Sequence, residues 1–275
     1  MINDTIQALT IAGTDSGGGA GVMADIKTMQ ERHVFSAAVV VAVTAQNTIG
    51  VADFMAMPEK LIDEQFKAVA DDLKIRAAKT GMLADVPSVK AVVANLKKYD
   101  LGPLTVDPVM IAKGGARLLS EDAIQTVKQE LVPLATILTP NLPEASELTG
   151  LKIESSDDML VAAQKLQYMG AKNVLVKGGH EADDKASADF VLLENGDSFW
   201  MTSPRVDTNR THGTGDTLSS CITAELAKGK SVEDAIRIGK EYVSATIEQG
   251  IQVGHGHGPL NHWAHVEGEA NDDEI

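Results

Sequence analysis

Short apolar runs alternate with longer segments of helical periodicity along most of this chain. We expect strands at 8–12, 38–43, 75–80, 104–107, 136–139 and 174–177. We expect helices at 20–31, 58–72, 86–98, 120–131, 156–169, 217–228 and 231–249. Several of the apolar runs are nearly continuous, which indicates strands that are covered on both faces. The alternation therefore predicts an α/β fold, with a mostly parallel sheet and right-handed crossovers.

Two further runs, 188–193 and 198–202, flank an Asn195-Gly196 dipeptide and predict an antiparallel hairpin. No linker, repeat or low-complexity stretch divides the chain, so we expect residues 1–265 to form one domain. The acidic segment 266–275 has the composition of a disordered, solubilising tail.

The charge of the chain argues against several classes of partner. Its formal net charge is -15, and such a field opposes nonspecific binding to nucleic acid or to an anionic membrane surface. No apolar run approaches the roughly 20 residues of a membrane helix, and the first residues do not resemble a signal peptide. The one cysteine, Cys221, permits no internal disulfide and fits a reducing compartment. We therefore expect a cytoplasmic protein that acts on a small molecule.

Glycines and polar residues follow the predicted strands, at the edge where ligands bind in parallel sheets. The first strand leads into the glycine-rich segment 13–21, which includes the start of a Gly-x-Gly-x-x-Ala pattern at Gly19. That pattern suggests dinucleotide binding, but the second strand ends near Gln46 with no carboxylate for a ribose diol. A flexible connection is the plain alternative. We favour a loop that packs on a small substrate, with Asp25 pointing back towards it.

A second glycine turn, Gly213-Thr214-Gly215-Asp216, precedes the helix predicted at 217–228. Amides at a helix N-terminus bind anions through their free N–H groups and the helix dipole. An anion hole with a carboxylate beside it would stabilise a transferring phosphoryl group and accept the proton of an attacking alcohol. A capping role for Asp216 is the plain alternative. The combination favours a kinase with Asp216 as its base.

Hard oxygen ligands also follow predicted strands. Asp107, Asn141 and Glu144 would suit a water-rich Mg²⁺ site that bridges nucleotide phosphates. An Asn-x-x-Glu sequence is equally an ordinary helix cap, and the residues alone leave both interpretations open. His255 and His257 have no cysteine or carboxylate partners at ligand spacing, so we favour structural closure over a metal site there.

Together these motifs resemble the hydroxymethylpyrimidine/phosphomethylpyrimidine kinases of the ribokinase-like superfamily. The matching segments are 9–21, 24–28, 44–48, 79–82, 107–110, 113–115, 139–144, 177–180, 211–215, 253–259 and 261–262. The resemblance spans about residues 8–263. It implies a three-layer α/β/α sandwich, a homodimer, and the use of ATP with Mg²⁺.

The resemblance also implies roles for individual residues. At the pyrimidine it places Gly13, Asp25, Gln46, Met82 and Val109. At Mg²⁺ it places Asp107 and Glu144, and at the nucleotide Asn141, Lys177, Lys113 and Lys240. The turn of Gly213, Thr214, Gly215 and Asp216 would face the transferring phosphate. The implied reaction phosphorylates the hydroxymethyl group of 4-amino-5-hydroxymethyl-2-methylpyrimidine, and also its monophosphate, in thiamine biosynthesis.

Asp216 departs from the pyrimidine kinases that the chain resembles, in which this position is commonly cysteine. Aspartate is the base of the wider superfamily, including many pyridoxal kinases, so a pyridoxal/pyridoxine kinase of vitamin B6 salvage is the alternative. The monophosphate is already an anion, and a carboxylate about 4 Å away would cost roughly 4 kcal/mol at an effective dielectric of about 20. We therefore expect Asp216 to favour phosphorylation of the alcohol and to handicap the second step.

Overall fold

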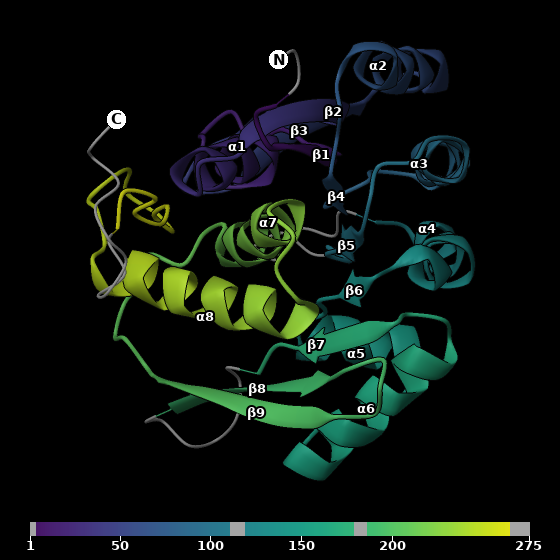
Figure 1. The fold of residues 1–275 in the computed structure, drawn as a ribbon. Helices are drawn as coiled ribbons and strands as arrows, with labels where there is room; N and C mark the ends of the chain where they lie inside the picture. The colour runs from purple at the N-terminus through teal and green to yellow at the C-terminus, as the bar shows by residue number, and fades with distance from the viewer. Residues whose placement is uncertain (1–3, 111–118, 179–185, 265–275) are drawn as a thin grey trace.

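One sheet runs through the computed structural model, which describes residues 4–110, 119–178 and 186–264 (Figure 1). Its strands are β1 (Gln7–Gly13), β2 (Phe35–Gln46), β3 (Val51–Ala56), β4 (Ala77–Thr80), β5 (Leu104–Val106), β6 (Ile137–Leu138), β7 (Asn173–Val176), β8 (Ala186–Leu192) and β9 (Ser198–Pro204). Their order in space is β3-β2-β1-β4-β5-β6-β7-β8-β9. The central strands pair in parallel, whereas β3, β8 and β9 pair with their neighbours in antiparallel fashion. The predicted α/β fold with a mostly parallel sheet is confirmed.

Helices cover both faces of this sheet in two separate layers (Figure 1). One layer contains α1 (Gly21–Glu31), α7 (Thr214–Ala227) and α8 (Val232–Glu248). The other contains α2 (Glu59–Asp72), α3 (Val86–Lys98), α4 (Glu121–Thr126), α5 (Leu142–Thr149) and α6 (Ser156–Tyr168). Because successive strand residues point to opposite faces, Leu9 and Ile11 of β1 belong to one apolar core and Ala8 to the other. Among the described residues no helix combines the length and the apolar character that crossing a bilayer requires.

Several elements differ from the sequence prediction. The edge strand β3 and the short helix α5 were not predicted, and β2 continues to Gln46, past the expected end at residue 43. Most of β3 is exposed, so its sequence lacks the apolar alternation that marks a half-buried strand. The helix expected at 120–131 becomes a π-helix over Val127–Leu131 and then a 3₁₀ turn over Val132–Leu134. The tail predicted for 266–275 lies outside the described residues.

Helix α7 is buried on all sides, so the polar side chains that it carries need partners inside the protein. Residues from Thr217 to Ala227 are all buried. The Thr223 hydroxyl donates to the Ser219 carbonyl at 2.7 Å, and Glu225 accepts from Arg32 of α1 at 3.0 Å. Buried polar groups are costly unless they are hydrogen-bonded. The first bond satisfies a hydroxyl within α7, and the bond from Arg32 helps to fix the position of this helix, whose first turn carries Asp216.

The ion pair between Arg32 and Glu225 provides a test of how α7 is held. Lys228 also reaches Glu225, at 2.8 Å, so Arg32→Met leaves that carboxylate compensated. We expect the free energy of unfolding to fall by about 2 kcal/mol, the worth of a hydrogen bond to a charged group. Adding Lys228→Met strands a buried charge, and we expect a total loss of about 3–5 kcal/mol or more. Urea denaturation measures both losses, and a double variant as stable as the single one would contradict the assignment.

Candidate active site

A cavity of about 690 Å³ opens at the carboxyl ends of the parallel strands. Its lining includes most of the predicted site residues: Gly13, Gln46, Met82, Asp107, Val109, Asn141, Glu144, Lys177, Gly213, Thr214, Gly215 and Asp216. These residues are far apart in the sequence and meet here because parallel strands end at the same edge of a sheet. The predicted Lys113 lies outside the described residues, whereas Asp25 and Lys240 do not line the cavity.

Close packing of backbone on backbone requires glycine at position 213, and the space at Gly215 is tight. Gly213 is the N-cap of α7 with φ of 84°, and a Cβ there would lie 2.0 Å from the Gly19 carbonyl oxygen. A Cβ on Gly215 would lie 3.1 Å from Asp107 Oδ2 and 3.3 Å from Lys177 Nζ. The first N–H groups of a helix have no acceptor within the helix, and the helix dipole adds positive potential around them. The turn therefore presents backbone donors to an anion in the cavity.

Asp216 lies in the first turn of α7 but does not cap it, because the N-cap is Gly213. Its side chain is 15% exposed, and Oδ1 lies 3.9 Å from the Nζ of Lys79. Burial raises the pKa of Asp216 to about 6; Lys79 opposes that rise, and Asp25 and Asp107 add to it. Such a carboxyl is ionised at neutral pH and still basic enough to accept a proton, as a general base must.

Asp107 and Glu144 form a second acidic group beside Lys177. Lys177 Nζ lies 3.0 Å from Asp107 Oδ1. Burial raises the pKa of Glu144 to about 7; Lys177 opposes the rise and Asp107 adds to it. The predicted capping interpretation is confirmed, because Asn141 and Glu144 exchange hydrogen bonds of 2.8 and 2.9 Å between side chain and backbone. Both side chains nevertheless line the cavity, so the cap leaves a site role open.

The oxygen ligands around Asp107 suit Mg²⁺ better than a metal that needs three or more protein side chains as ligands. Within residues 4–110, 119–178 and 186–264, no cluster of three or more His, Cys, Asp or Glu side chains could hold a metal ion. Mg²⁺ usually keeps several waters and takes one or two carboxylates together with substrate phosphates. Asp107 and Glu144 supply such carboxylates, and the raised pKa of Glu144 marks a place where a cation would be stabilising.

The other end of the cavity combines an apolar floor with one amide. Met82 belongs to a small apolar cluster that Val109 packs against. A Cβ on Gly13 would lie 2.5 Å from the Met82 methyl carbon, so glycine lets this methionine fill the floor. The Gln46 amide nitrogen lies 3.3 Å from His212 Nε2. An amide can both donate and accept, and over an apolar floor it suits the edge of a small heteroaromatic ring.

Asp15 organises the glycine-rich loop, a role that the sequence analysis missed. Its carboxylate accepts the backbone N–H groups of Gly17, Gly19 and Ala20 at 2.8, 3.0 and 3.0 Å. It also lies 2.8 Å from His212 Nε2. Burial alone would raise the pKa of Asp15, but the hydrogen bonds from His212 and Gly17 outweigh it and lower the pKa. Because these N–H groups are already bonded, they cannot hold a pyrophosphate, which removes the basis for the dinucleotide interpretation.

Two predicted contacts need correction. Asp25 is fully buried and accepts hydrogen bonds from Lys79, Thr10 and Ser220, so it cannot touch a substrate in this cavity. Helix α1 turns this side chain towards β4 and α7 and not towards the loop. Lys240 on α8 pairs with Asp189 of β8 at 2.8 Å, outside the cavity lining. A lysine within a predicted strand, as at Lys79, could have signalled a buried ion pair.

The C-terminal glycine-histidine segment packs against the β2–β3 hairpin, which fits the structural role expected for it, although this partner was not predicted. The His257 N–H donates to the Thr48 carbonyl at 2.8 Å. A Cβ on Gly256 would lie 2.1 Å from that carbonyl oxygen, so the close approach requires glycine. Cys221 is fully buried, as expected for a packing residue.

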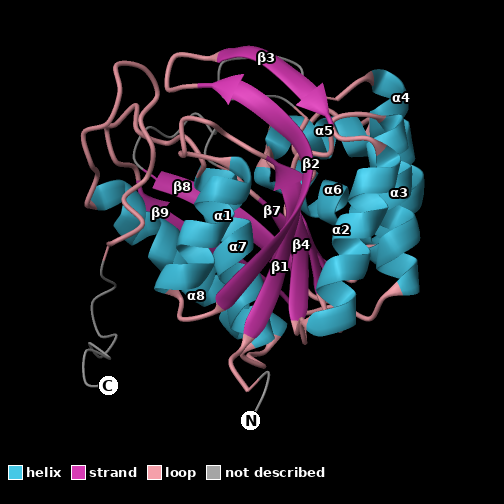
Figure 2. Cartoon of the chain, turned by 90° about the horizontal axis from the view of Figure 1, so that it is seen from above, coloured by secondary structure: helices cyan, strands magenta, loops and turns pink. Residues whose placement is uncertain are grey.

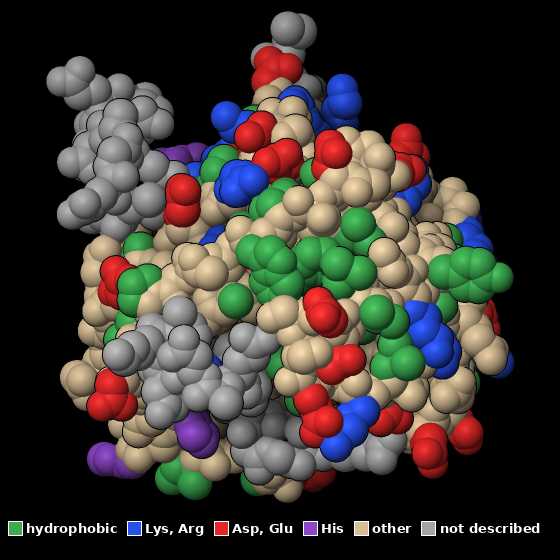
Figure 3. Space-filling model, turned by 90° about the horizontal axis from the view of Figure 1, so that it is seen from below, with side chains coloured by type: hydrophobic (Ala, Val, Ile, Leu, Met, Phe, Trp, Pro, Cys, Tyr) green, Lys and Arg blue, Asp and Glu red, His purple; other side chains and the backbone are tan. Residues whose placement is uncertain are grey.

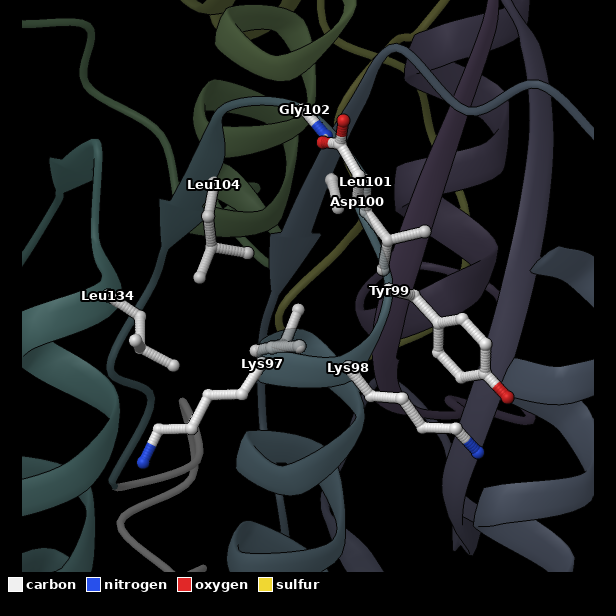
Figure 4. Close-up of a pocket in the computed structure, with 10 residues that line it drawn as sticks. Lys97, Lys98, Tyr99, Asp100, Leu101, Gly102, Leu104 and Leu134 are labelled. Atoms are coloured by element: carbon white, nitrogen blue, oxygen red, sulfur yellow. The ribbon is translucent and has the colours of Figure 1, made fainter.

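A second hollow of about 450 Å³ lies near the amino ends of β4 and β5 (Figure 4). It is lined by Ala78, Leu96, Lys97, Lys98, Tyr99, Asp100, Leu101, Gly102, Leu104 and Leu134. Lys97 and Lys98 extend away from one another in Figure 4, so they do not converge on a common anion. This hollow lies at the opposite end of the strands from the predicted site residues, and it contains none of them.

The chain is similar to phosphomethylpyrimidine kinases in both sequence and structure. The family model described as phosphomethylpyrimidine kinase matches residues 15–261. A hydroxymethylpyrimidine/phosphomethylpyrimidine kinase of Haemophilus influenzae is 48% identical over 261 residues, which cover 94% of this chain and 97% of the relative. A phosphomethylpyrimidine kinase structure from Clostridium difficile has a TM-score of 0.77 at 40% identity, covering 87% of this chain and 98% of its own.

The fold is also shared with a pyridoxal kinase. The structure of an ADP complex of the Bacillus subtilis enzyme has a TM-score of 0.87 at 35% identity and covers 95% of this chain and 98% of its own. This match confirms the ribokinase-like sandwich that the sequence predicted. The family model and the Haemophilus relative each cover most of the chain, and on that evidence it belongs to the phosphomethylpyrimidine kinase family.

Proposed function

We propose that this protein is an ATP-dependent kinase that phosphorylates the hydroxymethyl group of 4-amino-5-hydroxymethyl-2-methylpyrimidine in thiamine biosynthesis. One observation carries the proposal. The buried carboxylate of Asp216 lies beside the backbone donors at the start of α7, and the same cavity contains the Gln46 amide above an apolar floor. The name of the Haemophilus relative supports the same reaction.

The residues of the cavity divide the chemistry among them. Asp216 takes the proton of the hydroxymethyl group as the hydroxyl oxygen bonds to the γ-phosphorus of ATP, and the bond from that phosphorus to the β–γ bridging oxygen breaks, so that ADP leaves. The amides of the 213–216 turn stabilise the charge that develops on the transferring group. Lys177 and Asn141 face the nucleotide phosphates. When bound, Mg²⁺ would neutralise phosphate charge and fix its geometry, held through Asp107 and Glu144.

The monophosphate is a poorer acceptor in this arrangement. Its phosphate is already anionic and needs no base. The Asp216 carboxylate therefore repels this phosphate and provides no useful proton transfer in return. Lys177 is occupied by Asp107 at 3.0 Å, and Lys79 is fully buried. Lys177 already serves Asp107 and the nucleotide phosphates, and Lys79 does not line the cavity, so neither lysine is left to neutralise the phosphate of the acceptor as well. We propose that the alcohol is phosphorylated more efficiently than its monophosphate.

A second candidate is phosphorylation of pyridoxal or pyridoxine. The specific observation in its favour is the likeness to solved pyridoxal kinases, including a Staphylococcus aureus enzyme in complex with pyridoxal at 32% identity and a TM-score of 0.86. These substrates carry the same hydroxymethyl group on a six-membered heteroaromatic ring. The 48% identity to the Haemophilus pyrimidine kinase favours the pyrimidine.

Replacing the base provides the direct test. We expect Asp216→Asn to lose at least ~10²-fold in turnover, the usual worth of a general base. In the wild type, turnover should rise with pH through about 6, because burial raises the pKa of Asp216 to about 6 and only the ionised form accepts a proton. The variant should lack this acidic limb. Steady-state kinetics from pH 5 to pH 9 would measure both.

Stability provides the control for this variant. A carboxyl whose pKa is raised in the folded state costs stability as the pH rises from its ordinary pKa to the raised one, and the full cost remains above that, because its charge is buried. Above pH 7, Asp216→Asn should therefore melt no lower than the wild type, while ATP binding persists in calorimetry. Wild-type turnover in a well-folded variant would refute the role of Asp216.

The acceptor is identified by parallel assays. With MgATP, we expect kcat/KM to be highest for hydroxymethylpyrimidine and lower for its monophosphate. We expect it to be lowest for pyridoxal and pyridoxine. Coupled measurement of ADP release gives kcat/KM for each acceptor under one set of conditions. Equal efficiency on the alcohol and its monophosphate would show that the charge of Asp216 does not discriminate between them. A preference for pyridoxal would favour the second candidate.

We further propose that the protein is cytoplasmic, as its single cysteine suggests, and that it forms a homodimer. The outer surface of the β2–β3 hairpin supports the dimer. Figure 2 shows this hairpin extending beyond the helices. Val43 pairs with Met55 across the two strands, and these side chains are 46% and 65% exposed. The underside of the molecule in Figure 3 also carries apolar side chains, but charged residues surround them. We expect Met55→Glu to shift the mass in sedimentation from dimer to monomer; a wild-type monomer would refute the dimer.

A further inference from the structure

The mechanism above makes no use of Lys79, a charged residue in the centre of the sheet. Its side chain is fully buried, and its Nζ donates to Asp25 Oδ1 at 2.6 Å. The hydroxyls of Thr10 and Ser220 also donate to Asp25, each at 2.5 Å. A buried ion pair gives weak net stabilisation, and apolar residues of similar volume often serve as well or better. Its presence here therefore calls for another explanation.

The geometry connects this pair to the base. Lys79 Nζ lies 3.9 Å from Asp216 Oδ1. A Cβ on Gly81 would lie 3.8 Å from that Nζ and 3.9 Å from that Oδ1, so glycine leaves the space beside the two groups open. Asp216 also accepts a hydrogen bond from the backbone of Gly21, which helps to fix its orientation.

Among the described residues, charged groups from four different elements face Asp216. They are Asp25 on α1, Lys79 on β4, Asp107 after β5 and Lys177 after β7. Lys177 forms an ion pair with Asp107, and Lys79 forms one with Asp25. In the part of the chain that the structure describes, Lys79 forms the ion pair with the Asp216 carboxylate, and Asp25 is the anion that shares this cation.

We propose that Lys79 and Asp25 are positioning residues that set the pH range over which Asp216 works as a base. Lys79 keeps the buried carboxylate of Asp216 ionised. Asp25 partly neutralises the charge of Lys79, so that Asp216 stays basic enough to accept a proton. The two residues thus act on Asp216 in opposite directions. The inference rests on the proposed role of Asp216 as the base.

Opposite actions give opposite shifts in the pH profile. In Asp25→Asn, the amide oxygen can still accept from the hydroxyls of Thr10 and Ser220. The charge of Lys79 is then no longer neutralised by Asp25, and it stabilises the Asp216 carboxylate more strongly. The acidic limb should then move to lower pH. In Lys79→Met with Asp25→Asn, both charges of the pair are gone, so neither is stranded, and Asp216 loses its nearest cation. Because Lys79 is nearer to Asp216 than Asp25 is, the loss of its charge should outweigh the loss of Asp25. The acidic limb of the pH profile should therefore move about one pH unit or more above its wild-type position.

The matched control is Arg32→Met, which removes another buried cation that links α1 to α7. It should lower stability and leave the acidic limb in place. A purely structural role for Lys79 and Asp25 predicts the same pattern, with lower activity at every pH and no shift of the limb. Limbs that move in the same direction in both variants would overturn the proposal, and so would fixed limbs together with an unchanged pKa of Asp216.

A direct titration separates this inference from the role of the base. Carbon-13 NMR of labelled aspartate carboxyls, with the Asp216 signal assigned by its loss in Asp216→Asn, reports the pKa without any turnover. We expect the Asp216 pKa to fall in Asp25→Asn and to rise in the double variant. If these shifts occur while the kinetic limb stays fixed, the positioning is supported and the role of Asp216 as base fails. An unchanged Asp216 pKa in both variants overturns the positioning itself.

Discussion

The carboxylate of Asp25 joins four elements at the centre of the molecule. It lies on α1 and accepts from Thr10 of β1, Lys79 of β4 and Ser220 of α7. All four residues are fully buried, so each polar group depends on the others for compensation. Removing one partner of such a pair typically costs about 3–5 kcal/mol, because a charge is left without a partner. The relative positions of α1, the sheet and α7 therefore depend on this cluster, and Asp216 is placed with them.

Close approach of backbone to backbone makes the site narrow and well defined. The loop after β1 packs on the start of α7 so tightly that a Cβ on Gly213 would lie 2.0 Å from the Gly19 carbonyl oxygen. Gly21, with φ of 55°, would bring a Cβ to 2.4 Å from the Gly13 carbonyl oxygen. Asp15 holds the same loop through three backbone N–H groups. These glycines bring backbone close to backbone within the first loop and between the two loops. At the start of α7 the Thr214 N–H already donates to the Thr211 carbonyl, and the amides that follow it are the ones left for an anion.

The distribution of charge reconciles an acidic protein with an anionic substrate. The chain carries a formal net charge of -15, and its cavity contains the carboxylates of Asp107, Glu144 and Asp216. Backbone donors and Lys177 supply local attraction, and paired carboxylates invite a divalent cation. Because burial already raises the pKa of Asp216 and Glu144, each added anion is costly. The cavity is thus suited to phosphates that arrive with their own cation.

The sequence by itself determined the parallel sheet, the strand ends that carry the site, and the turn that holds Asp216. These features are local, because hydrophobic periodicity and glycine spacing reflect what each segment does alone. Tertiary structure decided the rest. The sequence could not show that Asp25 faces Lys79 and not the cavity, because the direction of a helical side chain depends on how α1 packs. It likewise could not bring Asp15 to His212, 197 residues apart, since only the assembled sheet places their loops side by side.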